Sequence, residues 1–142
     1  MDSRSERLLI GVHPDLARVI RAAEQLPQPF VVIYGLRSLA AEEEAVATHH
    51  SETLHSRHLA TASERGFACA VDVAALVDGR PDFAPGREAE IFGLIASQVL
   101  RAAKAAGVPV QWGGQPVGAW ADGEVSHFRD WGHFQLDPRE YP

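Results

Sequence analysis

Apolar residues recur at helical spacing in the first part of the chain, and this pattern predicts an amphipathic helix over 14–26. Pro14 suits the first turn of such a helix, because proline lacks an amide hydrogen that the turn would leave unbonded. Pro27 and Pro29 end the pattern. The β-branched and aromatic run 30–34 that follows predicts a buried strand.

The middle of the chain changes from an Ala- and Glu-rich pattern to a polar one. Residues 39–48 predict a second helix, and residues 49–66 predict an ordered loop that holds four of the seven histidines. The apolar run 68–76 predicts a second strand, and residues 77–81 predict a turn.

The last part of the chain repeats the change from helix to strand. Apolar positions predict a long helix over 88–106, and Gly107 is placed to end it. Residues 108–112 predict a short strand, 113–123 a glycine-rich loop, and 133–136 the last strand.

This order of elements predicts an α+β fold, with a small antiparallel or mixed sheet flanked by helices. The chain has 142 residues, and it shows no internal repeat and no linker. We therefore expect one domain that spans residues 1–142.

Composition narrows the classes of protein that the chain can belong to. Hydrophobic residues make up 46% and charged residues 23%, which is typical of a globular protein. The formal net charge of −6 argues against broad nucleic-acid binding. The single cysteine, Cys69, excludes an intramolecular disulfide and a cysteine-rich zinc finger.

The N-terminal residues do not resemble a secretory signal. Residues 1–7 are charged, and the apolar run 8–12 is too short for a signal core or a membrane span. We therefore expect the protein to accumulate in the cytoplasm, without membrane insertion. A substrate outside the membrane would then require a separate route of export.

Three residues far apart in the sequence form a plausible metal-ligand set: His58, Asp72 and His133. Two imidazoles and one carboxylate are a common ligand set of catalytic zinc, although they also suit Fe(II), Co(II) or Mn(II). Asp72 lies in an apolar strand, where a carboxylate is costly to bury without a partner. Asp130, three residues before His133, is placed either to move the proton of a water molecule or to orient a ligand histidine.

Five short strings in a fixed order relate this set to a known family. The chain resembles the phage L-alanyl-D-glutamate endopeptidases, within the group of zinc D-Ala-D-Ala carboxypeptidases and dipeptidases, over about residues 9 to 137. The strings are Gly11-Val12-His13-Pro14-Asp15-Leu16, Gly35-Leu36-Arg37-Ser38, Ser56-Arg57-His58 with Ala70-Val71-Asp72, Trp112-Gly113-Gly114, and Phe128-Arg129-Asp130 with His133-Phe134-Gln135-Leu136.

The resemblance implies a role for each matching residue. His58, Asp72 and His133 match the three zinc ligands, and Asp130 matches the general base and acid. Arg37 matches an arginine that binds a substrate carbonyl or carboxylate. From the residues alone, Arg37 is alternatively an ion-pair partner for the acidic run 42–44.

We also expect substrate contacts from Ser56, Trp112 and His127, which lie in or next to these strings. Trp112 is alternatively a core residue before a turn, and His127 a surface residue. The chain departs from the family pattern by insertions at 59–66 and 115–125. Because both insertions flank the expected site, they are expected to alter substrate fit and to leave the metal in place.

The function implied by the resemblance is zinc-dependent hydrolysis of the L-Ala–D-Glu bond in peptidoglycan stem peptides. As in a phage endolysin, we expect a monomer that stays in the cytoplasm until lysis and reaches the cell wall through a separate holin-type pore. Two alternatives stay open at this point. One is a D-Ala-D-Ala carboxypeptidase or dipeptidase with the same metal site, and the other is a non-catalytic relative that binds the cell wall.

Overall fold

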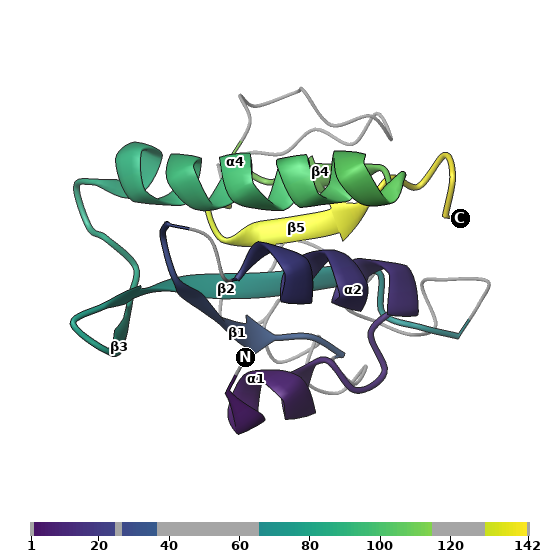
Figure 1. Cartoon of the computed structure of the whole chain (residues 1–142), viewed down its shortest axis with the longest axis horizontal. Helices are drawn as coiled ribbons and strands as arrows, with labels where there is room; N and C mark the ends of the chain where they lie inside the picture. Colours follow the sequence, from purple (N-terminus) through teal and green to yellow (C-terminus); the bar gives the residue numbers. More distant parts are fainter. Residues whose placement is uncertain (1, 25–26, 37–65, 115–129, 142) are drawn as a thin grey trace, which may run out of the picture.

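The computed structural model describes residues 2–24, 27–36, 66–114 and 130–141 (Figure 1). The predicted helix 39–48, almost all of the loop 49–66 and most of the loop 113–123 lie outside the described residues. The elements follow in the order α1 (Ser3–Leu8), α2 (Pro14–Ala23), β1 (Phe30–Tyr34), β2 (Ala70–Val77), β3 (Arg80–Asp82), α4 (Glu88–Ala106), β4 (Val110–Trp112) and β5 (His133–Leu136).

The strands form a five-stranded sheet in which every strand pair is antiparallel, with the order β1-β2-β5-β4. Strand β2 is the longest, and it is paired along both of its edges. Strand β1 lies along one edge, whereas β5 pairs with the beginning and β3 with the end of the other edge. The predicted α+β fold with a small sheet is therefore confirmed.

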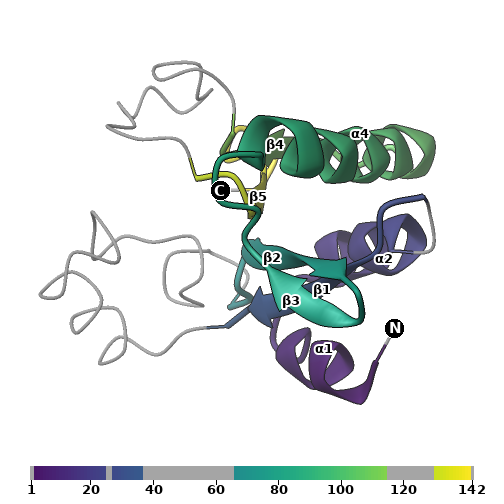
Figure 2. The same ribbon diagram turned by 90° about the vertical axis from the view of Figure 1, so that its left-hand side faces the viewer.

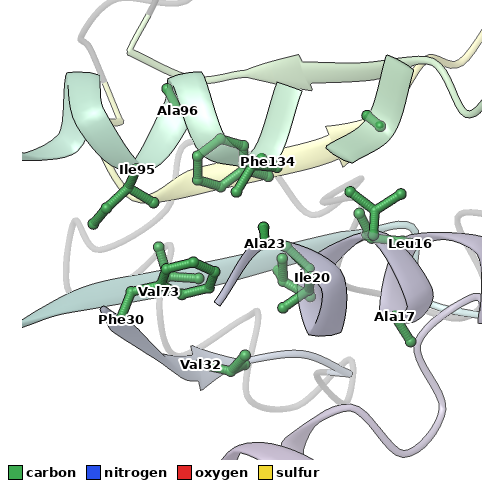
Figure 3. Packing of buried hydrophobic residues seen from close by; sticks show 14 of the residues in the cluster. Leu16, Ala17, Ile20, Ala23, Phe30, Val32, Val73, Ile95, Ala96 and Phe134 are labelled. Carbon is green, nitrogen blue, oxygen red and sulfur yellow. The ribbon is translucent and has the colours of Figure 1, made fainter. Parts of the chain in front are cut away.

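Helices α2 and α4 cover the same face of this sheet (Figure 2). Alternate strand residues point towards them, because side chains in a strand alternate between its two faces. Figure 3 shows Phe134 between α4 and β5, and Phe30 and Val73 below α4. These side chains belong to one buried apolar cluster, which includes Leu16, Val19, Ile20, Val32, Val71, Ile95, Val99 and Leu136.

The two long helices begin and end close to the predicted residues. Helix α2 starts at Pro14, and Nδ1 of His13 accepts a hydrogen bond of 3.1 Å from the Asp15 amide, which caps the helix. Helix α4 spans the predicted 88–106. Gly107 follows it with a φ of 71°, a left-handed conformation that glycine adopts without steric cost.

Helix α1 was not predicted, because six residues are too few to show a helical period. Its first turn is capped by the Asp2 side chain, which accepts a bond of 2.7 Å from the Ser5 amide. The buried Ser5 hydroxyl oxygen in turn accepts a bond of 3.1 Å from the amide of Val32 in β1. This contact holds α1 against the edge of the sheet, which would otherwise expose an unpaired strand.

The predicted turn at 77–81 is wrong in its length. Only Asp78 and Gly79 form the turn, both with positive φ (52° and 75°), as in a tight two-residue hairpin. The chain then continues as β3, in which Arg80 pairs with Val77. Pro81 is tolerated there because β3 lies at the edge of the sheet.

Candidate functional site

Asp72 and His133 are directly opposite each other on the antiparallel strands β2 and β5. Their neighbours Val71, Val73 and Phe134 point into the apolar core, so the two polar side chains point to the face turned away from α2 and α4. A shift of one residue in this register would bury Asp72 and expose the core valines, and the hydrophobic pattern therefore specifies the site geometry.

The two side chains are in contact and are largely shielded from water. Nδ1 of His133 lies 2.9 Å from Oδ1 of Asp72. The side chains are only 11% and 17% exposed, respectively. Burial on its own lowers the pKa of His133, but the bond to Asp72, together with the charges of Asp72 and Asp130, raises this pKa to about 9.

Asp130 reaches the same imidazole from a tight turn. The His133 amide donates to the Asp130 carbonyl oxygen at 3.2 Å, which places the two side chains next to each other. Oδ2 of Asp130 lies 3.9 Å from Nδ1 of His133. The Asp130 side chain is 45% exposed, and it therefore has more access to solvent than Asp72 does.

Glycines allow this turn to lie close to the sheet. The Gly113 amide donates to the His133 carbonyl at 2.8 Å, and the Asp130 amide donates to the Gly113 carbonyl at 2.9 Å. A Cβ at Gly113 would lie 2.5 Å from the Asp130 carbonyl oxygen. A Cβ at Gly132 would likewise collide with the Val73 carbonyl oxygen. Only residues without a side chain fit at these two positions.

The other ring nitrogen of His133 faces a glutamine. Nε2 lies 2.9 Å from Oε1 of Gln135, and Nε2 of Gln135 donates a bond of 3.1 Å to Oε1 of Gln111. Gln111 and Gln135 are cross-strand partners on β4 and β5. The prediction did not include either glutamine, although Gln135 lies two residues after His133 and therefore shares its face of the strand.

Tyr34 is a second residue that the sequence did not single out. It pairs with Asp72 across β1 and β2, and a bulge at Ile33 shifts the register just before it. Bulges of this kind redirect a side chain next to many functional sites. Because of the bulge, the half-exposed Tyr34 lies on the same face as Asp72 rather than on the core face.

The two carboxylates and the imidazole of this site can together hold a metal ion. Asp72, Asp130 and His133 each offer one ligand atom, and these atoms all lie within 4.8 Å of one another. One imidazole nitrogen with carboxylate oxygens fits zinc, although other divalent ions accept the same donors. The described residues thus bring together the predicted ligands Asp72 and His133 and the predicted catalytic Asp130.

The other predicted site residues have different outcomes. The ligand His58, the catalytic Arg37, and the substrate-binding Ser56 and His127 lie outside the described residues. Trp112 is described, and it pairs with Phe134 on the core side of the sheet. Its indole Nε1 donates a bond of 2.7 Å to the Trp131 carbonyl oxygen, which braces the turn after Asp130. Its contact with substrate stays a prediction.

The comparisons with known proteins identify a family. The family model described as phage L-alanyl-D-glutamate peptidase matches residues 1–136. The chain is similar to the crystal structure of Serratia marcescens L-Ala D-Glu endopeptidase ChiX, with 39% identity and a TM-score of 0.76, over 99% of this chain and 91% of that chain. No curated protein sequence matches the chain.

A second solved structure is more distant. It is the vancomycin resistance D,D-dipeptidase VanXYg in complex with a D-Ala-D-Ala phosphinate analog, with 18% identity and a TM-score of 0.48. The match covers 88% of this chain and 50% of that chain.

None of the helices in the described part of the chain is both long enough and apolar enough to span a membrane.

The family match covers nearly the whole chain, and the solved relative is similar over the same length. The resemblance seen in the five sequence strings is therefore confirmed. The chain is a peptidase that belongs to the phage L-alanyl-D-glutamate peptidase family.

Proposed function

We propose that this peptidase hydrolyses the L-Ala–D-Glu bond of peptidoglycan stem peptides with a zinc ion held by His58, Asp72 and His133. The observation that carries the proposal is the convergence of Asp72, Asp130 and His133 within 4.8 Å on the face of the sheet away from the helices. The family match and the solved L-Ala D-Glu endopeptidase support the choice of bond.

The donor chemistry supports zinc as the ion. Nδ1 of His133 and Oδ1 of Asp72 face each other at 2.9 Å, so a cation can be shared between them after small adjustments. His58 would complete a set of two imidazoles and one carboxylate, which leaves a coordination position for water. When bound, zinc supplies Lewis-acid activation of that water and of the scissile carbonyl.

We assign the proton transfers to Asp130. Its carboxylate is more exposed than that of Asp72 and lies farther from Nδ1 of His133, which suits a base better than a buried ligand. It accepts a proton from the attacking water as the C–O bond forms. The C–N bond to D-Glu then breaks, and Asp130 returns the proton to the leaving amine.

The remaining predicted residues are proposed to bind the substrate. Arg37 would place positive charge at the carbonyl oxygen or at a stem-peptide carboxylate. Such a local charge is needed because the protein is acidic overall and its net charge does not attract an anionic substrate. Ser56, Trp112 and His127 would contact the peptide on either side of the bond. Trp112 would also act through the turn that it braces at Trp131.

Mass spectrometry of purified peptidoglycan after digestion tests the proposal. We expect new N-terminal D-Glu, and none with the Asp130→Asn protein at the same concentration. Release of D-Ala instead would assign a D-Ala-D-Ala carboxypeptidase or dipeptidase. Binding to the cell wall without any new terminus would assign a non-catalytic relative.

We further propose that the protein is a monomer, that it remains in the cytoplasm until lysis, and that a separate holin-type pore releases it. The phage family supports this order of events. Expression with and without a holin tests it, because lysis should follow only when both are present. Light scattering of the purified protein should give the mass of one chain, 15.4 kDa.

A further inference from the structure

The two nitrogens of the His133 ring contact different groups. Nδ1 faces the carboxylate of Asp72 at 2.9 Å, whereas Nε2 faces the amide oxygen of Gln135 at the same distance. An amide oxygen only accepts hydrogen bonds, so Nε2 must carry the hydrogen in this contact. The proton that Nδ1 shares with Asp72 is then the one that a bound cation would displace, which would free the electron pair of Nδ1 for the metal.

A second amide fixes the orientation of the first. Nε2 of Gln135 donates to Oε1 of Gln111 at 3.1 Å. If the Gln135 amide alone rotated by half a turn, its oxygen would face the oxygen of Gln111, and the bond between the two amides would be lost. Gln135 is only 4% exposed, so water could not replace that bond.

We propose that Gln135, oriented by Gln111, is a positioning residue that makes Nδ1 the metal-binding atom of His133. This inference rests on the zinc site of the proposed function. Hydrogen bonds from the second nitrogen of a ligand histidine commonly fix its tautomer and ring angle, and their loss weakens metal binding by about 10–100-fold.

The three side chains of Gln111, Gln135 and His133 form a hydrogen-bonded relay, and the pairing of the strands explains how the sequence brings them together. His133 and Gln135 are two residues apart on β5 and share one face, and Gln111 is the direct partner of Gln135 on β4. The relay therefore lies on strands rather than on loops, and rigid elements hold ligands more accurately.

Gln135→Met is the main test, because methionine keeps the length of the side chain and removes the amide. We expect zinc affinity, measured by competition with a chelator, to fall about 10–100-fold. In protein loaded with ¹¹³Cd, ¹⁵N NMR should show coupling of cadmium to Nδ1 of His133 in the wild type. In Gln135→Met, we expect that coupling to weaken or to be shared with Nε2.

Three further variants separate positioning from general stability. Gln135→Glu keeps an acceptor and should retain coupling to Nδ1. Gln111→Met should weaken affinity less than Gln135→Met does. Gln28→Met removes an amide that bonds to the Leu76 carbonyl at the other end of β2. This control variant should affect only the melting temperature, and the cadmium coupling should stay as in the wild type.

The inference is overturned if Gln135→Met retains wild-type zinc affinity and Nδ1 coupling. It is also overturned if cadmium couples to Nε2, or to neither nitrogen of His133, in the wild-type protein. The digestion of peptidoglycan reports on the proposed function separately. An active enzyme with unchanged coupling in Gln135→Met would refute the relay and leave the proposed function standing.

Discussion

Oδ1 of Asp72 and Nδ1 of His133 lie 2.9 Å apart, although the two residues are 61 positions apart in the sequence. The contact follows from the antiparallel pairing of β2 and β5, in which these two residues are direct partners. Each of these proposed ligands is thus held by the hydrogen-bonded sheet, and removal of one side chain should leave the backbone of the other in place.

The first prediction concerns metal content. We expect about one zinc ion per chain in the wild type, and much less in His58→Ala, Asp72→Ala and His133→Ala, because each variant would lose one of the three proposed protein ligands. Elemental analysis of protein purified without added metal measures this. His49→Ala serves as the matched control and should keep its zinc. Full occupancy in all three ligand variants would refute the assignment.

The second prediction concerns Asp130. Asp130→Asn should keep the fold and the metal but lower turnover by about 10²–10⁴-fold, the usual contribution of a general acid–base group. Steady-state kinetics on a soluble stem-peptide substrate measure the change. Glu140→Gln removes a carboxylate from an exposed position and should have little effect. Near-normal turnover in Asp130→Asn would mean that another group moves the proton.

The third prediction concerns Arg37. Arg37→Lys keeps the charge but replaces a planar fork by a point charge, so kcat/KM should fall while zinc content and melting temperature stay near wild type. Arg18→Lys is the matched control, because Arg18 is an exposed arginine that pairs with Asp15. Lower stability with unchanged kcat/KM would instead make Arg37 a structural partner of the acidic run 42–44.

The fourth prediction concerns the glycine that supports the Asp130 turn. Gly113→Ala should lower both melting temperature and activity, because its Cβ would lie 2.5 Å from the Asp130 carbonyl oxygen. Gly93→Ala is the control within α4, where nothing lies within 4 Å of the new Cβ. It should stabilise the protein by up to about 1 kcal/mol, since alanine favours helices over glycine. Equal melting temperatures for the two variants would contradict the crowding argument.

The sequence predicted those parts of the fold in which a local pattern is long enough to read. The predicted helix over 88–106 and strands over 30–34 and 133–136 match α4, β1 and β5. Helix α1 and strand β3 were missed because each depends on contacts with another strand. Ser5 bonds to Val32 in β1, and Arg80 pairs with Val77 in β2.

Part of the candidate site could be predicted from the sequence, where the residue type and its neighbours indicated a function. Asp72 stood out as a carboxylate in an apolar strand, and Asp130 as a partner three residues before a histidine. Gln111 and Tyr34 gave no such signal. Their placement depends on strand register, and for Tyr34 also on a bulge, which a sequence without known pairings does not specify.

Asp72 lies in β2, a strand that is paired along both of its edges, with Tyr34 across one edge and His133 across the other. Amide hydrogens in such a strand exchange with solvent only in openings that approach global unfolding, whereas edge strands and turns open more easily. The Asp130 turn therefore has a freedom to follow a substrate that the backbone of Asp72, the proposed ligand, lacks. The backbone that carries Asp72 should accordingly be among the last parts of the sheet to open, so destabilising mutations in the core should loosen the Asp130 turn before they displace Asp72.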